Sequence, residues 1–572
     1  MDKIKRLIGV AKGDIQADLV LKNARVFNSF TGQFIDGDIA ITDGLIAGVG
    51  DYIGRREINL DGKVVTPGFI DGHVHIESSM LSPMEFARAV VPNGTTTVIA
   101  DPHEIANVCG LGGIEYMLNS TEDLPLSVYV MLPSCVPASP FENAGAKLSA
   151  DDLAKFIDHP RVLGLGEMMN YPGVLSGDKA VLDKLMMAQA KIVDGHAPGL
   201  MGNDIMAYAA AGIKSDHECV NPEQAMERLQ AGMHLMIREG SAAHNLLQLL
   251  PVVNKFTAQF CLFATDDRHP SDLIGTGHIN NMVRMAVEAG YEIPTVLQMA
   301  TINAAHYLGL RDIGAIAPGY KADLLVFDEL ITWKPSLVFK DGIKVAEHHR
   351  ALFCGSDFAS AEIKKTVRLA ALDGEKLKIP AKSNLARVIE LVPQQIVTKA
   401  RQMEVKVENG GLATDIEADI LKLAVFERHH ATGNVGVALV HGYGLKRGAI
   451  ASTIAHDSHN LIVMGTNDAD MLAAAKEIER LQGGIVIVED GKVLKSLALP
   501  LAGLMSDEGV HFVEAQLSAL KILAHEMGVK ACHDPFLTLA FLSLPVIPEL
   551  KLTDLGLVDG CAFRFTEVSV EA

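Results

Sequence analysis

Residues 68–75 read GFIDGHVH, a short apolar run that ends in two histidines two positions apart. Seven further runs of this kind follow, and longer stretches of helical character separate them. They are 95–100 (TTTVIA), 126–132 (LSVYVML), 162–167 (VLGLGE), 191–196 (KIVDGH), 213–217 (IKSDH), 233–238 (MHLMIR) and 261–266 (CLFATD). Strands that alternate with helices pair in parallel, and eight of them suit a closed barrel. The sequence therefore predicts a (β/α)8 TIM-like barrel over residues 68–311.

Strand character also flanks the predicted barrel on both sides. Before the barrel, apolar residues alternate with polar ones, and Asp43-Gly44 between two such runs is a strong hairpin signal. After the barrel, residues 314–327 return to the same pattern. We predict that residues 1–67 and 312–368 pair with each other as one small β-sandwich domain.

The remaining chain, residues 369–572, has the mixed pattern of an α/β domain. A helix is predicted over 414–428, and strands are predicted over 433–441 and 460–464. Two more strands are expected on either side of the turn signal Asp490-Gly491. The predicted fold class is thus α/β: a barrel, a flanking β-sandwich and a C-terminal α/β domain.

Composition excludes several classes of function. The chain has 50 Lys and Arg against 70 Asp and Glu, and this formal net charge of -20 argues against binding to nucleic acid or to anionic membranes. Its 7 cysteines include no CxxC pair, which is typical of a reduced protein without disulfides. No signal-peptide pattern and no apolar run long enough to span a bilayer is present. We therefore expect a cytoplasmic protein.

Side chains with metal-ligand chemistry stand at the carboxyl ends of five predicted strands. They are His73, His75, Glu167, His196, His217 and Asp266. On a strand, positions i and i+2 point to the same face, and the ends of barrel strands meet at one rim. An HxH pair alone is a weak signal, because a lone histidine is more simply a hydrogen-bonded loop residue. Four imidazoles and two carboxylates on one rim, however, form a set that suits Zn, Mn, Fe or Co.

Two motifs resemble those of the amidohydrolase superfamily. Residues 66–75 (TPGFIDGHVH) resemble the entry motif of these barrels, and residues 319–324 (GYKADL) resemble the segment that re-enters the small β domain. The resemblance implies a (β/α)8 barrel with a metal centre at its C-terminal face and a flanking β-sandwich. Many binuclear members carry a carboxylated lysine at the end of the fourth strand, where this chain has Glu167. That departure argues against the dihydroorotase and urease branches, although a glutamate can also bridge two ions.

Further stretches resemble the adenine deaminases within that superfamily. They are 101–108 (DPHEIANV), 194–198 (DGHAP), 215–218 (SDHE), 263–268 (FATDDR), 428–433 (RHHATG) and 455–460 (AHDSHN). The resemblance covers essentially the whole chain. It implies a small-molecule substrate, adenine, that is hydrolysed to hypoxanthine and ammonia in purine salvage. Hydroxide generated at a divalent metal would attack C6 of the purine.

The resemblance also implies roles for individual residues. His73, His75, Glu167, His196 and His217 are expected to bind a divalent transition metal, as a binuclear centre with manganese first and iron or zinc as alternatives. Asp266 is expected to ligate the metal or lie against it, and to carry the proton from the attacking water to the leaving amine. Ring nitrogen N1 also needs a proton, and Glu104 and Glu218 are the candidates. His103 and Arg238 are candidates for an additional metal or for substrate.

Several polar residues have plainer interpretations. We expect Asp267 and Arg268 to form an ordinary ion pair, with a role in shaping the site as the alternative. Arg238 has the alternative of a structural pair with Glu239 or another acid. In the C-terminal segment a second polar cluster is interpreted as a capping and loop network. The alternative is that this segment closes over the barrel mouth or supports the pocket. Its members are His429, His430, His456, Asp457 and His459.

Two other functions stay open at this point. One is a different amidohydrolase that acts on a cyclic amide, such as a relative of dihydroorotase or hydantoinase. The other is a catalytically inactive homologue that serves as a scaffold. The sequence is also compatible with a homo-oligomer that has neither a nucleic-acid nor a membrane partner.

Overall fold

The computed structural model describes residues 1–355, 358, 360–393 and 395–571. All eight predicted barrel strands are present. They are β6 (Phe69–His75), β7 (Thr95–Ala100), β8 (Ser127–Leu132), β9 (Val162–Met168), β10 (Ile192–Gly195), β11 (Ser215–Asp216), β12 (His234–Arg238) and β13 (Cys261–Ala264), with β14 (Asp266–Asp267) one residue further on.

The eight strands run parallel and close on themselves. One sheet has the order β10-β9-β8-β7-β6-β14, and a second has the order β11-β12-β13. The two sheets meet where Lys214 N–H donates to the carbonyl of Val193 at 3.0 Å. On the other side, β14 pairs with β6, with Asp266 opposite Val74. The predicted barrel is therefore confirmed.

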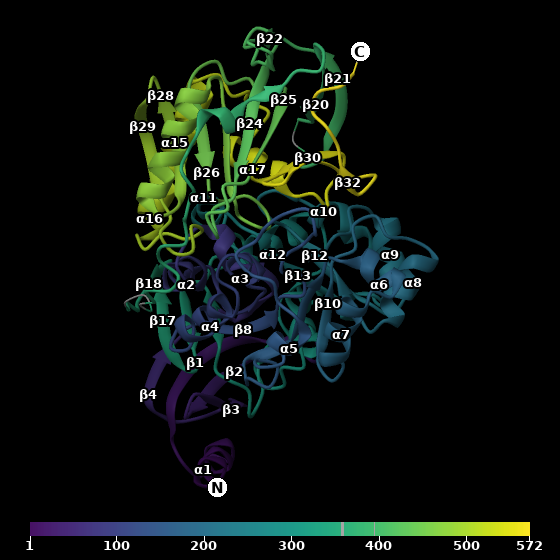
Figure 1. Cartoon of the computed structure of the whole chain (residues 1–572). Coiled ribbons are helices and arrows are strands. Elements are labelled where there is room, and N and C mark those ends of the chain that lie inside the picture. The colour runs from purple at the N-terminus through teal and green to yellow at the C-terminus, as the bar shows by residue number, and fades with distance from the viewer. Residues whose placement is uncertain (356–357, 359, 394, 572) are drawn as a thin grey trace.

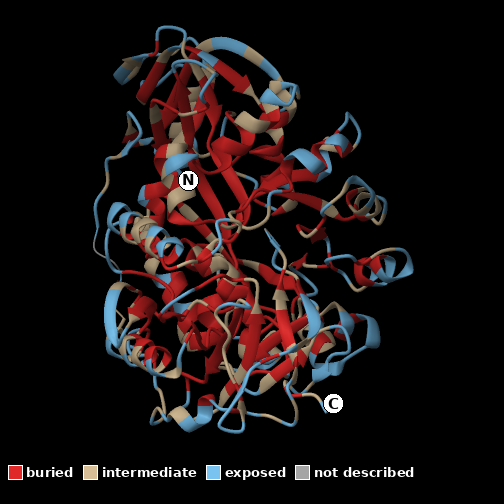
Figure 2. Cartoon of the chain, turned by 90° about the horizontal axis from the view of Figure 1, so that it is seen from above, coloured by how far each residue is buried: buried red, intermediate tan, exposed pale blue. Residues whose placement is uncertain are grey.

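Helices between the strands surround the barrel (Figure 1). They include α2 (Pro83–Val90), α3 (His103–Cys109), α4 (Leu111–Ser120), α7 (Lys179–Met187), α8 (Asn203–Ala210), α9 (Pro222–Gln230), α12 (Ile279–Glu288) and α14 (Ile302–Tyr307). Inside the barrel, an apolar layer includes Ile70, Ile99 and Met236 and packs against α14. Figure 2 shows that the strands at the centre of the molecule are mostly buried, whereas exposed residues lie on the helices and loops around them.

The segments before and after the barrel together form a nine-stranded sheet. Its order is β18-β17-β16-β15-β5-β1-β2-β3, with β4 also paired to β1. The strands are β1 (Ala17–Asn28), β2 (Gln33–Thr42), β3 (Leu45–Gly50), β4 (Gly54–Asn59), β5 (Val64–Pro67), β15 (Leu324–Phe327), β16 (Leu337–Lys340), β17 (Ile343–Glu347) and β18 (Arg350–Ala351). The predicted pairing of the two segments occurs between β5 and β15, where Val65 lies opposite Val326. Asp43 and Gly44 both have positive φ, 50° and 80°, as the predicted hairpin turn requires.

The C-terminal segment is built on an eight-stranded sheet of order β21-β20-β25-β24-β27-β26-β28-β29. Its strands are β20 (Leu385–Leu391), β21 (Thr398–Glu404), β24 (Ile420–Phe426), β25 (Val435–His441), β26 (Ala449–Ser452), β27 (Leu461–Gly465), β28 (Gly484–Glu489) and β29 (Lys492–Ala498). Helices α15 (Asp468–Leu481) and α16 (Val510–Glu526) accompany the sheet, which is seen in green and yellow in Figure 1. The α/β character predicted here is confirmed.

The helix predicted over 414–428 is wrong. Residues 420–426 form β24, which pairs with β25 on one side and β27 on the other. Every residue of β24 is buried. A short, continuous apolar run does not distinguish a buried strand from a buried helix, and here the neighbouring strands decide the outcome.

The C-terminal segment packs against the barrel (Figure 1). Asn143, in the loop after β8, donates its backbone N–H to Asp554 Oδ1 at 2.9 Å. His430 Nε2 lies 3.1 Å from the carbonyl oxygen of Ala144, and Ser506 N–H donates to the carbonyl of Met80. Loops that follow barrel strands therefore lie beneath this segment. Within the described part of the chain, no helix combines the length and apolarity needed to cross a membrane.

Candidate metal centre

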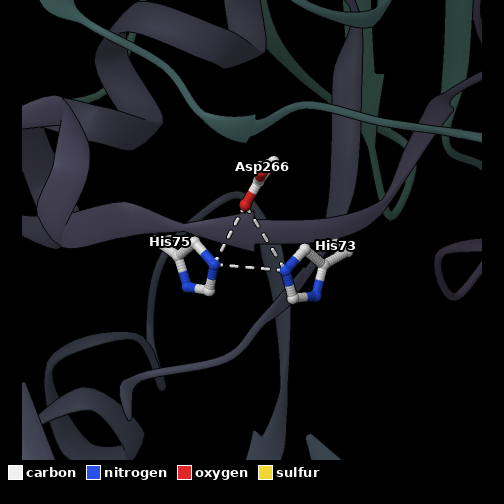
Figure 3. Close-up of side chains that lie close together, drawn as sticks. All are labelled: His73, His75 and Asp266. Carbon is white, nitrogen blue, oxygen red and sulfur yellow. Dashed lines mark hydrogen bonds and ion pairs between the residues drawn. The ribbon is translucent and has the colours of Figure 1, made fainter. Parts of the chain in front are cut away.

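His73 and His75 project from the end of β6 toward Asp266 at the start of β14 (Figure 3). The two Nε2 atoms are 3.2 Å apart. Asp266 Oδ1 lies 3.7 Å from His73 Nε2 and 3.1 Å from His75 Nε2. All three residues are buried. The i, i+2 spacing on a strand thus brings both rings to one point, as the sequence predicts.

This donor set fits a divalent cation. His75 Nδ1 lies 2.9 Å from the carbonyl oxygen of Asp101, so that nitrogen carries the proton and the Nε2 lone pair faces His73. Two nitrogens that bind one ion tetrahedrally at about 2.1 Å are about 3.4 Å apart, close to the spacing seen here. A positive charge between them also removes the repulsion of facing lone pairs.

Glu167, at the end of β9, lies between two groups of histidines. Its Oε1 lies 3.2 Å from His75 Nε2. Its Oε2 lies 2.6 Å from His196 Nδ1 and 3.3 Å from His217 Nε2. The two carboxylate oxygens therefore face different sets of nitrogens, which is the arrangement that a carboxylate bridging two ions requires.

Asp101 positions Glu167 and was assigned no role from the sequence. Asp101 Oδ2 accepts the backbone N–H of Glu167 at 3.0 Å, and its own carbonyl orients His75. Burial alone would raise the pKa of Glu167, but the His196 charge and the neighbouring rings of His103 and His217 hold it well below its usual range. The sequence signals for Asp101 are its place directly after the second barrel strand and its position at the start of the stretch 101–108.

Arg238 holds two acids at the same rim. Its Nη1 lies 2.8 Å from Asp266 Oδ2, and its guanidinium also pairs with both oxygens of Glu218. Burial opposes ionisation of Glu218, but Arg238 and the neighbouring His196 keep its pKa below the ordinary value. The expected alternative, a pair of Arg238 with Glu239 or another acid, is thus confirmed for other acids. Glu239 itself accepts hydrogen bonds from His244 and from the N–H of Leu246 instead.

His103 and Glu104 begin α3, directly after β7. His103 Nδ1 lies 3.2 Å from Glu167 Oε1, within the same cluster. Glu104 is turned away from it: its Oε1 lies 2.9 Å from His456 Nδ1, and its Oε2 contacts His459 Nε2. The interpretation of these C-terminal histidines as a capping and loop network is therefore wrong. They reach across to a barrel residue more than 350 positions earlier.

The predicted ion pair between Asp267 and Arg268 is also wrong. Asp267 Oδ1 accepts a hydrogen bond from Ser78 Oγ at 2.5 Å. Arg268 instead donates to the backbone carbonyls of Glu239 and Gly277, at 3.0 Å and 3.1 Å. Neighbours in sequence point to opposite sides of an extended backbone, so the two side chains separate.

A buried ion pair supports the loop that carries His217 and Glu218. Arg228 Nε donates to Asp216 Oδ2 at 2.8 Å, and its Nη2 donates to the carbonyl of Ala197 at 2.7 Å. Asp216 Oδ1 in turn accepts the N–H of Glu218 at 3.0 Å. Both side chains of the pair are fully buried.

Removing this arginine should be costly to stability. Arg228→Ala leaves the Asp216 carboxylate buried without its partner, and we expect a loss of about 3–5 kcal/mol in the free energy of unfolding. Urea denaturation followed by circular dichroism measures it. Arg284→Ala, which removes a half-exposed pair with Glu288, is the matched control and should cost at most about 1 kcal/mol. Equal losses in both variants would contradict the role given to Arg228.

Comparisons with known proteins agree with this arrangement. Residues 64–361 match the amidohydrolase family, and residues 395–564 match the adenine deaminase C-terminal domain. The chain is 60% identical over 570 residues to adenine deaminase 2 of Carboxydothermus hydrogenoformans, and this covers 100% of each chain. It is 48% identical to the adenine deaminase of Desulfatibacillum aliphaticivorans, over 98% of this chain and 99% of the relative. It is also 48% identical to the adenine deaminase of Clostridium acetobutylicum, over 99% of each. The chain therefore belongs to the adenine deaminase family of amidohydrolases.

Proposed function

We propose that this protein hydrolyses adenine to hypoxanthine and ammonia, a reaction of purine salvage. The observation that supports this most is the single rim on which each member of the set lies within contact distance of at least one other. The set is His73, His75, Glu167, His217 and Asp266. Relatives named adenine deaminase match the chain from end to end.

The metal centre is proposed to be binuclear. His73 and His75 with one oxygen of Glu167 would hold the first ion, and His196 and His217 with the other oxygen would hold the second. Manganese is the first choice and iron or zinc the alternative, because the nitrogen and carboxylate donors suit all three. A divalent ion in such a site lowers the pKa of bound water to about 7 and so supplies a nucleophile at neutral pH.

Asp266 is proposed to move the proton. Its Oδ1 faces His73 and His75, while Arg238 holds Oδ2 at 2.8 Å and so fixes the direction of the carboxylate. Burial opposes ionisation, but the neighbouring His73 and His75 and the charge of Arg238 keep the pKa of Asp266 well below its usual range. The carboxylate is thus ready to accept a proton from the attacking water. It can then deliver that proton to the departing amine nitrogen.

Of the two candidates for the proton at purine N1, Glu218 fits better. Its Oε1 lies 3.4 Å from His217 Nε2 and 3.8 Å from His196 Nδ1, so it faces the space beside the centre. Glu104 is engaged by two imidazoles of the C-terminal segment. We therefore propose that the Glu218 carboxylate accepts one proton of the attacking water and passes it to N1, while Asp266 carries the other proton to the amine. Glu104 is given a positioning role.

We also propose the division of the chain into three parts. These are a small β domain of residues 1–67 and 312–368, a barrel of residues 68–311 and a C-terminal α/β domain of residues 369–572. The nine-stranded sheet that contains β5 and β15 supports the first of them.

Metal removal tests the proposed function directly. Protein dialysed against a chelator should lose ammonia release from adenine, and Mn²⁺ added back should restore it, because the nucleophile depends on the ion. Hypoxanthine is followed by its absorbance, and metal content by plasma mass spectrometry. Ring opening of dihydroorotate or hydantoin without turnover of adenine would favour another amidohydrolase. Protein that binds no Mn²⁺ and turns over none of these compounds would favour the scaffold.

A further inference from the structure

The Glu104 carboxylate joins the barrel to the C-terminal segment. Glu104, His456 and His459 are all buried, and their side chains form one cluster. His456 Nδ1 lies 2.9 Å from Glu104 Oε1, while His459 Nε2 contacts Oε2. Each oxygen of the carboxylate therefore faces one ring nitrogen from the other part of the chain.

The backbone around His459 shows that this ring acts as a donor. His459 Nδ1 accepts the N–H of Ala455 at 3.2 Å, so the neutral ring carries its proton on Nε2. Burial lowers the pKa of His459 to about 4, which keeps the ring neutral at physiological pH. Its Nε2–H then points at Glu104. His456 and His459 thus hold the Glu104 carboxylate through their ring nitrogens, and we call these three residues the clamp. Their ring nitrogens are not available as ligands for another metal ion.

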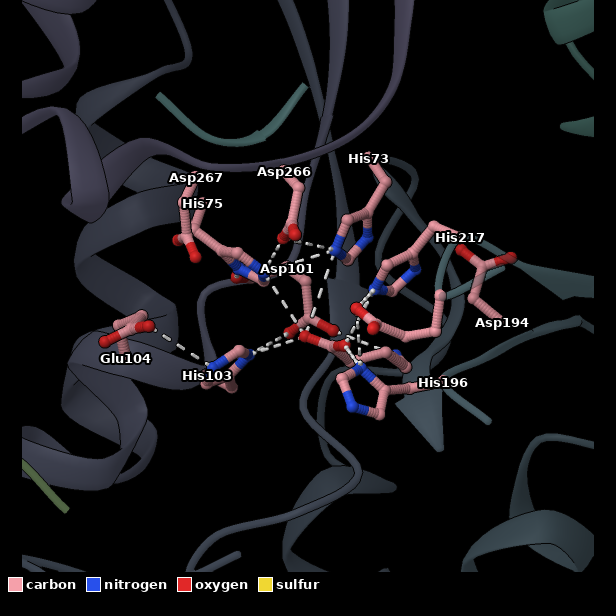
Figure 4. Close-up of polar contacts among 12 residues, drawn as sticks. His73, His75, Asp101, His103, Glu104, Asp194, His196, His217, Asp266 and Asp267 are labelled. Carbon is pink, nitrogen blue, oxygen red and sulfur yellow. Dashed lines mark hydrogen bonds and ion pairs between the residues drawn. The ribbon is translucent and has the colours of Figure 1, made fainter. Parts of the chain in front are cut away.

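His103 connects the clamp to the candidate metal centre (Figure 4). Its Nε2 lies 3.4 Å from Glu104 Oε1, and its Nδ1 lies 3.2 Å from Glu167 Oε1. The ring is buried, and Nδ1 has no hydrogen-bond donor or acceptor in suitable geometry among the described residues. A carboxylate at Nε2 selects the tautomer that carries its proton there, which leaves the Nδ1 lone pair directed at the metal side.

We propose that His456 and His459 are positioning residues for the metal centre. By fixing Glu104 they set the tautomer of His103, whose Nδ1 then joins His75 and Glu167 as a ligand. The C-terminal segment thereby contributes to metal binding without touching the ion. This inference rests on the proposed function, because it needs a metal beside Glu167.

Four variants test the clamp. His456→Ala and His459→Ala remove the donors, whereas His456→Asn and His459→Gln each keep an amide N–H near the lost ring nitrogen. We expect Mn²⁺ affinity, measured on apoprotein by chelator competition, to fall about 10–100-fold in the alanine variants. The amide variants should recover most of it. The kcat for adenine should fall with the affinity, while KM changes little, because the clamp does not face the purine.

His430→Ala is the matched control. His430 belongs to the same face of the C-terminal segment and bonds to the carbonyl of Ala144, but it makes no contact with Glu104. Its Mn²⁺ affinity and kcat should equal those of the wild type. The inference is overturned if the alanine variants at 456 and 459 also keep wild-type affinity. It is overturned as well if alanine and amide variants lose affinity equally, since packing alone would then explain the loss.

Glu104→Gln gives a second line of test that does not depend on the histidine variants folding. The amide keeps the shape of the carboxylate, so weaker Mn²⁺ binding here reports the lost charge. Combined with His459→Ala it should lose no more affinity than Glu104→Gln alone, because both act through the same carboxylate. Additive losses would contradict the clamp. A wild-type protein that neither binds Mn²⁺ nor releases ammonia would instead overturn the proposed function.

Discussion

Asp266→Asn is expected to lower the kcat for adenine about 10²–10⁴-fold while leaving KM nearly unchanged. The range is that of a lost general base. The amide can still accept a hydrogen bond from Arg238, which lies 2.8 Å from Oδ2 in the wild type. It cannot take a proton from water and pass it to the amine. Steady-state kinetics of hypoxanthine formation, on protein of known Mn²⁺ content, measures the effect.

The choice of asparagine follows from the backbone at this position. Asp266 has φ of 58°, in the left-handed region that asparagine adopts more readily than most residues. The variant should therefore keep the wild-type melting temperature, so that a kinetic loss reports chemistry. Asp312→Asn, a half-exposed partner of Lys321, serves as control and should retain full activity. Near wild-type kcat in Asp266→Asn would remove the proton-transfer role.

Glu167→Gln should reduce both metal content and activity. The two Glu167 oxygens face His75 on one side and His196 on the other, so the carboxylate is placed to bind one cation with each oxygen. An uncharged amide cannot bind two cations in this way. Loss of a metal contribution of several kcal/mol corresponds to about a 10³-fold fall in kcat. Plasma mass spectrometry should find less Mn²⁺ per chain than in the wild type. Two full equivalents and normal turnover would speak against a bridging carboxylate.

A buried carboxyl elsewhere supplies the control for that variant. Burial, together with the nearby Asp457 and Asp554, raises the pKa of Glu142 to about 8. This side chain is therefore mostly protonated at pH 7 and already resembles an amide. Its Oε1 accepts a hydrogen bond from Ser139 Oγ at 2.9 Å, which a glutamine oxygen can also accept. Glu142→Gln should keep wild-type metal content and kcat.

The barrel could be predicted because each strand carries its own local signal. Residues 95–100 and 162–167, for example, are short apolar runs bounded by polar segments, and they form β7 and β9 almost to the residue. The central strand β24 lacked such a signal. Apart from Lys422, its sequence ILKLAVF is apolar on both faces, and every residue of the strand is buried. Such a pattern does not distinguish strand from helix.

The candidate site likewise has residues that could be predicted from the sequence and contacts that could not. Side chains such as His217 and Asp266 stand at the ends of recognisable strands, so their convergence follows from barrel geometry alone. The contact between Glu104 and His456 spans 352 positions and joins the barrel to the C-terminal segment. No periodicity in either segment encodes it. Only the packing of the C-terminal segment on the barrel brings these residues together.

The ladder between β5 and β15 places the two ends of the barrel segment side by side. Val65, just before the barrel segment, lies directly opposite Val326, just after it. A segment whose entry and exit adjoin can be inserted into, or rejoined within, another chain with only a short linker. The barrel segment therefore begins and ends at neighbouring points of the structure. Circular permutants of the barrel segment, in which β5 is linked to β15 and new termini are opened in an exposed loop far from the rim, are expected to fold.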